Sequence, residues 1–218
     1  MSSQLLFRII SLLGLIGIAA AIVWAIRSQL IQVAEAKQAL RQQSLDLAHN
    51  LRQWRALSTP ALLHTLRRFF YLATLASALI LALTGFLPVI VFGATVSNLA
   101  LMLHLGLAPL FALGITALAL FWAQRHRFDR NDWQSLQQWF KKEKPAARQE
   151  NPNVWQKICF WLSLLLALPV IVSTVLMMYP LYGTTGQEWL LHLHGYAGLL
   201  LLAVVVLHTY LVLANKRE

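Results

Sequence analysis

Five long stretches of apolar residues decide what this chain can fold into. Each is long enough to cross about 30 Å of hydrocarbon as a helix, which takes roughly 20 residues. They are residues 5–26, 69–92, 99–123, 158–179 and 189–213. Of the 218 residues, 58% are hydrophobic and only 12% are charged, a composition that excludes a water-soluble globule. The sequence therefore predicts an all-α integral membrane protein.

The first apolar stretch is predicted to stay in the protein as a transmembrane helix. Charged Arg27 directly follows Trp24, Ala25 and Ile26, so the small-residue cleavage site of a secretory signal peptide is missing. We expect three parts: a transmembrane helix at residues 1–27, an amphipathic cytoplasmic segment at 28–66 and a four-helix bundle at 67–218. The amphipathic segment is expected at the membrane surface or against a partner, because apolar residues recur at helical spacing in residues 28–57.

The basic residues of the chain are concentrated in alternate segments between the apolar stretches. The formal net charge is +10, yet residues 93–98 and 180–188 contain no Lys or Arg. The Lys and Arg residues gather in residues 27–68, in residues 125–157 and after residue 213. By the positive-inside rule these segments face the cytoplasm, which places the N-terminus outside the bacterial inner membrane and the C-terminus inside. Membrane topology thus explains the charge, and no nucleic-acid partner is expected.

A single cysteine, Cys159, limits the cofactors that the chain can hold. It excludes a disulfide scaffold and an iron–sulfur cluster held by cysteines of this chain alone. The Cys-x-x-Cys-His pattern of covalently attached haem is absent as well. Any haem must therefore be bound by side-chain ligands without a covalent bond.

Two histidines in the last apolar stretch carry the clearest functional signal. His194 and His208 are fourteen residues apart, which on a helix puts both rings on one face and about 21 Å apart along the axis. A histidine in hydrocarbon is costly and normally marks a functional site. Neutral imidazole is a common iron ligand, so the spacing predicts two haems stacked across the membrane.

His104 is the predicted partner of His194. Each lies five residues inside the outer end of its span, so the two depths match. We expect a bis-histidine haem site between the third and fifth spans; the alternative is a hydrogen-bonding role between helices. Gly106, Gly195 and Gly198 flank these histidines and would admit either a flat macrocycle or a closely packed helix.

Three other histidines are predicted to lie outside the haem sites. His192 points about 160° away from His208 on the helical wheel, which places it at the outer interface. His49 and His126 fall in polar, basic segments, where we expect them to face solvent or lipid headgroups.

Residues 67–215 resemble a known family, the b-type cytochrome subunit of respiratory formate dehydrogenases and related dihaem, quinone-reactive membrane cytochromes. The last span, with Leu193-His194-Gly195-Tyr196-Ala197-Gly198 and then His208-Thr209-Tyr210, is similar to the family's last helix, whose two histidines ligate different haems. Further similarity lies in Leu103-His104, in Leu83-Thr84-Gly85 and in the segment from Asn153 to Trp161.

One position departs from the family pattern. The ligand expected fourteen residues before Gly85 is Tyr71 here, and the nearest histidine is His64, about 10.5 Å further toward the cytoplasm. Three possibilities follow for the inner haem. His64 ligates it if the helix begins early or bends; Tyr71 or another subunit completes the site; or His208 binds no haem at all.

The resemblance implies an electron-transfer subunit of an oxidoreductase complex rather than a stand-alone enzyme. It implies two haems b, with quinone or quinol reacting near the cytoplasmic haem and contacting Asn153 and Gln156. Trp155 stands where the family has a glycine, which narrows that site. The expected partner at the outer face is an iron–sulfur or cytochrome c subunit. The alternative is a single-haem or non-redox membrane anchor.

Overall fold

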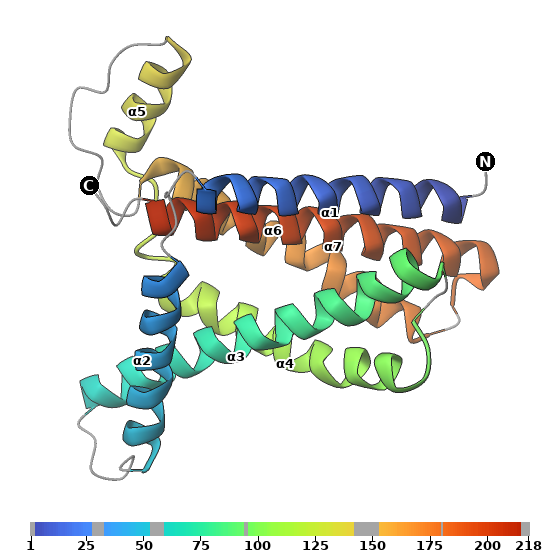
Figure 1. The fold of residues 1–218 in the computed structure, drawn as a ribbon, viewed down its shortest axis with the longest axis horizontal. Helices are drawn as coiled ribbons and strands as arrows, with labels where there is room; N and C mark the ends of the chain where they lie inside the picture. Colours follow the sequence, from blue (N-terminus) through green and yellow to red (C-terminus); the bar gives the residue numbers. More distant parts are fainter. Residues whose placement is uncertain are drawn as a thin grey trace.

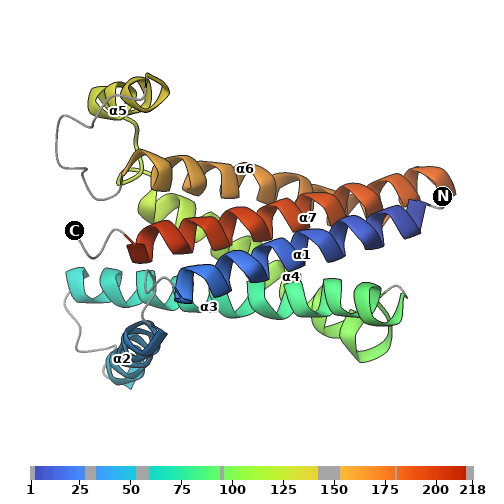
Figure 2. The same cartoon turned by 45° about the horizontal axis from the view of Figure 1, so that its top comes forward.

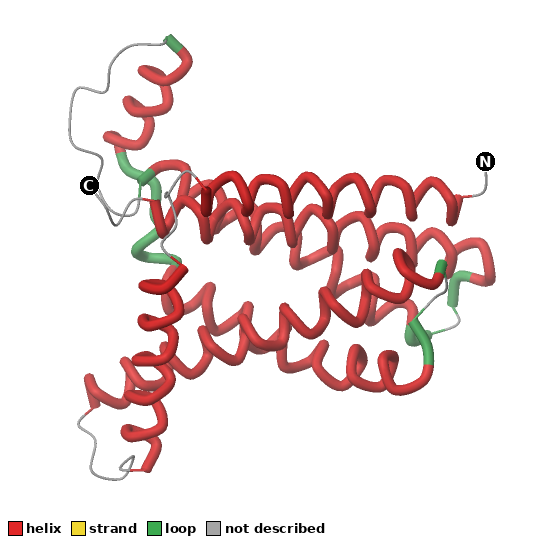
Figure 3. Tube along the Cα trace, viewed as in Figure 1, coloured by secondary structure: helices red, strands yellow, loops and turns green. Residues whose placement is uncertain are grey.

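Every regular element is a helix in the part of the chain that the structure, a computed structural model, describes: residues 3–27, 33–52, 59–93, 96–141, 153–179 and 181–214 (Figure 3). Five helices are long and apolar enough to cross a membrane, at Leu5–Trp24, Thr59–Phe92, Asn98–Trp122, Val154–Met177 and Gly183–Val212. The predicted all-α membrane fold is confirmed.

The spanning helices are α1 (Ser3–Arg27), α3 (Thr59–Leu87), α4 (Asn98–Trp122), α6 (Val154–Met177) and α7 (Gly183–Ala214). α3 continues into a π-helical turn, η2 (Pro88–Phe92), which ends at Gly93 with a φ of 63°. α1, α4 and α7 run in one direction, and α3 and α6 run in the other (Figures 1 and 2). Two shorter helices, α2 (Val33–Arg52) and α5 (Arg130–Phe140), lie crosswise at the end where α1, α4 and α7 finish (Figure 1).

The spanning helices form two hairpins, α3 with α4 and α6 with α7. Packing within each hairpin is extensive, whereas contact between the hairpins is much sparser. Gly114 of α4 makes the close approach to Thr74 of α3 possible, because any side chain there would collide with the threonine. Between the hairpins, halfway along α7, a small apolar layer is formed by buried Phe111, Ala167 and Leu201.

Two spanning helices begin at least six residues earlier than the apolar stretches predict. α3 begins at Thr59, not at residue 69, and α7 begins at Gly183, not at residue 189. The extension of α7 is polar, and that of α3 is interrupted by His64, Arg67 and Arg68, so uninterrupted apolar stretches do not reveal them, although a helix can project beyond the hydrocarbon core. Pro60 in the first turn of α3 is tolerated because the N–H that it lacks has no partner in the helix.

α2 lies within residues 28–57, where an amphipathic helix is predicted, and it packs against the first turns of α3. Asp46 accepts a hydrogen bond of 2.9 Å from Arg68, and Asn50 donates one of 3.2 Å to Thr65. Leu47 is buried. At least one face of α2 is therefore covered by this chain itself.

Candidate functional site

The structure brings His104 of α4 and His194 of α7 together, and we call them the outer pair. Their ring centroids are 6.1 Å apart, and the ring planes are inclined by 68°. His104 lies in the second turn of α4, and the matched depth that the sequence predicts for the two residues holds in three dimensions.

Thr84 of α3 fixes the orientation of the His104 ring. Its hydroxyl lies 2.7 Å from the carbonyl oxygen of Ile80, to which it donates, so that Oγ1 accepts from Nδ1 of His104 at 2.9 Å. Gly85 leaves room for this contact, since a Cβ there would stand 3.2 Å from Cε1 of His104. With the proton on Nδ1, Nε2 carries the lone pair that can bind a metal.

One turn of α6 fixes the His194 ring in the same way. Nδ1 lies 3.1 Å from the carbonyl oxygen of Val170, which can only accept, so this nitrogen carries the proton. The hydroxyls of Ser173 and Thr174 lie 3.3 Å and 3.1 Å from the same nitrogen. Both hydroxyls also bond to the carbonyl of Val170, and Ser173 is fully buried. Nε2 of His194 is again the nitrogen left for a ligand.

A second pair of imidazoles lies at the other end of α7, and we call it the inner pair. His208 faces His126, with ring centroids again 6.1 Å apart and ring planes inclined by 50°. His126 follows α4 in a turn in which its Nδ1 lies 3.0 Å from the carbonyl oxygen of Trp122. His126 is only 7% exposed. The expectation that this residue faces solvent or headgroups is therefore wrong.

Three residues on one face of α6 bury His126. Phe160 stacks on its ring at 4.1 Å with an interplanar angle of 17°. Trp161 donates a hydrogen bond of 2.9 Å to its carbonyl oxygen. Lys157 forms a buried ion pair of 2.7 Å with Asp132, which ties the following segment to α6. Burial lowers the pKa of His126, and this favours the neutral ring that a metal requires.

The sequence missed His126 because no local signal marks it. It stands between Arg125 and Arg127, and the residues that bury it lie more than thirty positions further along the chain. Only the tertiary packing of α6 against the end of α4 reveals the site. A weak clue was available in the three α6 residues, which follow one another at helical spacing.

His64 and Tyr71, the predicted candidates for the inner site, are exposed on α3. α3 does begin early enough for His64 to be helical, yet the structure describes no contact between either residue and His208. The physical reason is the pairing of the helices, since α3 packs mainly on α4 and has little contact with α7. The structure thus does not bring the His64 side chain to the inner pair.

Asn153 and Gln156 form a capping box at the start of α6. Asn153 Oδ1 accepts from the backbone N–H of Gln156 at 3.0 Å, and Gln156 Oε1 accepts from that of Asn153 at 3.1 Å. Gln156 Nε2 donates to the carbonyl of Leu211 in α7 at 2.8 Å, and the residue is 1% exposed. These side chains position α6 against α7, and an Asn-x-x-Gln pattern before an apolar run is a recognisable signal for such a cap.

Gly195 faces α1 and not an open cavity. A Cβ at this position would stand 2.5 Å from Cζ of Phe7, which also contacts the Tyr196 ring edge-on at 5.0 Å. Of the two alternatives for this glycine, close helix packing is the one that the structure shows. Gly106 is exposed on α4, and a Cβ there would meet nothing within 4 Å among the described residues.

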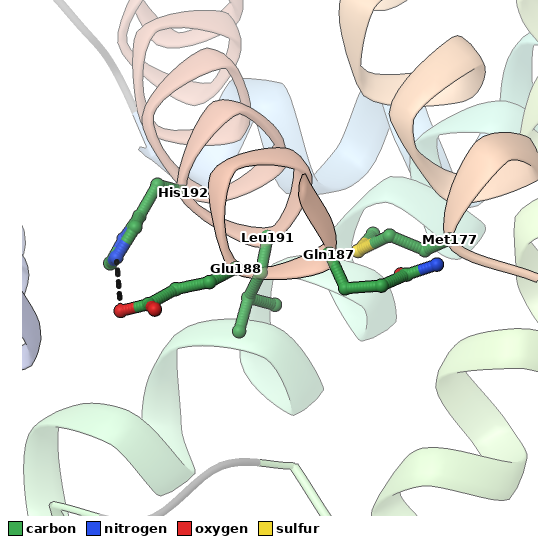
Figure 4. Close-up of a pocket in the computed structure, with 5 residues that line it drawn as sticks. All are labelled: Met177, Gln187, Glu188, Leu191 and His192. Atoms are coloured by element: carbon green, nitrogen blue, oxygen red, sulfur yellow. Dashed lines mark ion pairs between the residues drawn. The ribbon is translucent and has the colours of Figure 1, made fainter. Parts of the chain in front are cut away.

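The outer end of α7 carries a small pocket of about 420 Å³ (Figure 4). It is lined by Met177, Gln187, Glu188, Leu191 and His192. His192 Nε2 lies 3.7 Å from Glu188 Oε1, and its ring packs near that of Phe7 at 6.4 Å. His192 is thus engaged away from both histidine pairs, on the side that the helical wheel predicts.

Both histidine pairs have the spacing that a haem iron between two imidazoles requires. A metal–imidazole bond is about 2 Å long and a ring nitrogen lies about 1.1 Å from the ring centre, so two imidazoles on one metal have centroids about 6 Å apart. The pairs measure 6.1 Å each. A direct N–H···N hydrogen bond would instead bring the centroids to about 5 Å. The residues present therefore fit haem at both ends of the bundle.

The chain matches a family model described as prokaryotic cytochrome b561 over residues 88–218. The matched region contains α4, α6 and α7, and with them both histidine pairs. No curated protein and no solved structure matches the chain. Because the matched residues make up more than half of the 218, the chain belongs to the prokaryotic cytochrome b561 family.

Proposed function

We propose that this chain is a dihaem cytochrome b subunit that carries electrons across the bilayer between the quinone pool and a redox partner. Family membership already makes it a multi-pass membrane b-type cytochrome of transmembrane electron transfer, with haem b as its cofactor. The observation that carries the finer proposal is the repetition of one arrangement: two imidazole pairs, each with centroids 6.1 Å apart, at two levels of α7.

Haem b held between two imidazoles supplies reversible one-electron chemistry, because no open iron position remains to bind a substrate. The chain's own residues prepare these sites. Thr84, Val170 and the carbonyl of Trp122 each hold a histidine Nδ1, which leaves Nε2 as the nitrogen that could bind iron. Such outer contacts raise the basicity of the ligand and fix the ring. The apolar layer at Phe111, Ala167 and Leu201 lies between the two levels.

The direction across the membrane follows from the charges. We place the inner pair at the cytoplasmic face, because α2, α5 and the last turn of α7 lie at the end that carries the basic segments (Figure 1). The resemblance to the formate dehydrogenase b subunit supports a quinone site at that face and an iron–sulfur or cytochrome c partner near the outer pair. Gln156 contacts the end of α7 that carries His208, and contact of Asn153 and Gln156 with quinone would require their capping box to open.

A difference spectrum of the purified full-length protein tests this function. We expect Soret and α bands in the reduced-minus-oxidised spectrum, two components in a potentiometric titration, and reduction by a quinol analogue. A protein without any haem bands would leave only the non-redox anchor. One component in place of two would support a single-haem subunit. Reduction by dithionite without reduction by quinol would remove the quinone from the proposal.

A further inference from the structure

We propose that His126 is the second axial ligand of the inner haem, opposite His208. This inference rests on the proposed function and names the ligand that the resemblance leaves open. It assigns the role to a residue beyond the end of α4, in a basic segment where sequence analysis expects a surface histidine. Both haem sites then join the same two helices, α4 and α7.

The first observation is the separation of the two rings. The centroids of His126 and His208 lie 6.1 Å apart, the same distance as in the outer pair. This distance is too long for a direct hydrogen bond between two imidazoles and agrees with one metal atom between them. Because two histidine pairs with equal ring spacing lie along α7, we infer that both pairs hold the same kind of cofactor.

The second observation is the way in which His126 is held. Its Nδ1 lies 3.0 Å from the Trp122 carbonyl oxygen, which can only accept, so Nε2 is the unprotonated nitrogen. Phe160 stacks on one face of the ring, and Trp161 fixes the backbone carbonyl of the same residue. Both the tautomer and the ring plane are therefore set in advance, as a ligand site requires.

The third observation is an unsatisfied atom on the opposite ring. Nδ1 of His208 is buried and has no hydrogen-bond partner of good geometry among the described residues. A buried polar nitrogen without a partner is costly, so the described residues alone leave this ring incompletely held. If both histidines had only structural roles, one of them would be expected to satisfy this nitrogen.

The competing ligands do not share these features. His64 and Tyr71 are exposed on α3, and neither contacts His208 in the described part of the chain. A ligand from another subunit would have to displace His126 from its place beside His208. The geometry therefore favours a site that this chain completes by itself.

The test uses the full-length protein purified from haem-sufficient cells, with haem per chain and low-temperature EPR as readouts. The wild type is expected to hold two low-spin haems. His126→Ala and His208→Ala should each remove the same EPR component and leave the outer one unchanged. His64→Ala and Tyr71→Phe are the matched controls and should keep both components. Retention of both components by His126→Ala, or loss of the inner one by His64→Ala, would overturn the inference.

His126→Met guards against loss of the site through misfolding. Methionine is itself an axial haem ligand and raises the reduction potential relative to histidine. The variant should therefore keep two haems, with one component at a higher potential and the other unchanged. A purely structural His126 would give two unshifted potentials. A wild type without haem would refute the proposed function itself, whereas two haems that are insensitive to His126 would refute only this assignment.

Discussion

The hydroxyl of Thr84 determines which nitrogen of His104 can bind iron. It is the only side chain described as a hydrogen-bond partner of that ring, and it comes from α3, outside the α4–α7 pair that supplies the ligands. Nδ1 of His194 lies near the hydroxyls of Ser173 and Thr174 as well as a backbone carbonyl, so no single side-chain substitution would remove all of its partners. Thr84 is therefore the position at which one deleted atom leaves a ring of the outer pair without its side-chain partner.

Thr84→Val should weaken haem binding at the outer pair. Valine keeps the shape of threonine but cannot accept from Nδ1 of His104, and loss of such an outer contact typically lowers metal affinity by about 10–100-fold. Haem titration of the purified protein measures the effect. Thr116→Val is the control, because that hydroxyl bonds only to its own helix at Ala112. Equal haem retention by the two variants would show that Thr84 does not act through His104.

Among the elements, α6 supplies no histidine and yet holds two of the four pair members, His126 and His194. Its first turns carry Lys157, Phe160 and Trp161 against His126, and Gln156 against the end of α7. Three turns later, Val170, Ser173 and Thr174 surround Nδ1 of His194. α6 thus acts as a positioning helix for both levels of the bundle.

Lys157→Met should destabilise the protein by about 3 kcal/mol, because it leaves the buried carboxylate of Asp132 without its cation. The side chains of Lys157 and Asp132 are 6% and 9% exposed, so solvent cannot compensate well. Thermal unfolding in detergent measures the loss, and the inner EPR component should broaden. Lys141→Met removes an equal charge at an exposed site and serves as control. Similar melting temperatures for the two variants would contradict the role assigned to the ion pair.

The sequence predicts the elements better than their ends. The five spans follow from hydrophobicity because lipid, and not a specific partner, is their surrounding. The outer pair follows from matched depths on two helices. The inner pair cannot be predicted in this way. His126 lies after the end of α4, between basic residues that predict a surface position, and only tertiary contacts bury it. Hydrophobicity also does not predict the early starts of α3 and α7, since polar or charged residues separate these first turns from the long apolar stretches.

At the scale of the whole molecule, α1 is a fifth bundle helix that lies outside the region matched to the family. It runs along α7, where Gly14 meets Leu199 and Phe7 covers Gly195. Arg8 donates a hydrogen bond of 3.1 Å to the carbonyl of Ile90 in η2, so α1 also reaches the end of the other hairpin. Whether its exposed face docks a partner stays a prediction; its inner face belongs to this fold.

Gly14→Leu should detach α1 or shift it. A Cβ at Gly14 would stand 3.2 Å from Leu199, and overpacking of this kind costs about 1–3 kcal/mol. Gly17→Leu, one turn away, adds the same side chain where nothing lies within 4 Å. Limited proteolysis and thermal unfolding should separate the two variants. Identical behaviour would mean that α1 does not pack on α7 in the membrane.

Labelling of single cysteines tests the orientation of the bundle. In a Cys159→Ser background, a cysteine introduced by Thr185→Cys should react with an impermeant maleimide in intact spheroplasts, because it lies in the first turn of α7, in a segment without basic residues. Asn131→Cys, in the first turn of α5, should react only after permeabilisation. The reverse labelling pattern would contradict the proposed topology and would place the inner pair at the outer face of the membrane.

The sparse contact between the two hairpins gives the cofactor a further importance. The outer pair joins α4 of one hairpin to α7 of the other, and the inner pair joins the turn after α4 to α7, across a boundary with few contacts between the helices. Haem bound at these pairs would stabilise the association of the α3–α4 and α6–α7 hairpins, since a ligand that binds only the assembled state stabilises that state. Porphyrin supply should then govern how much of this protein survives the cell's quality-control proteases, much as a missing subunit does for an obligate dimer.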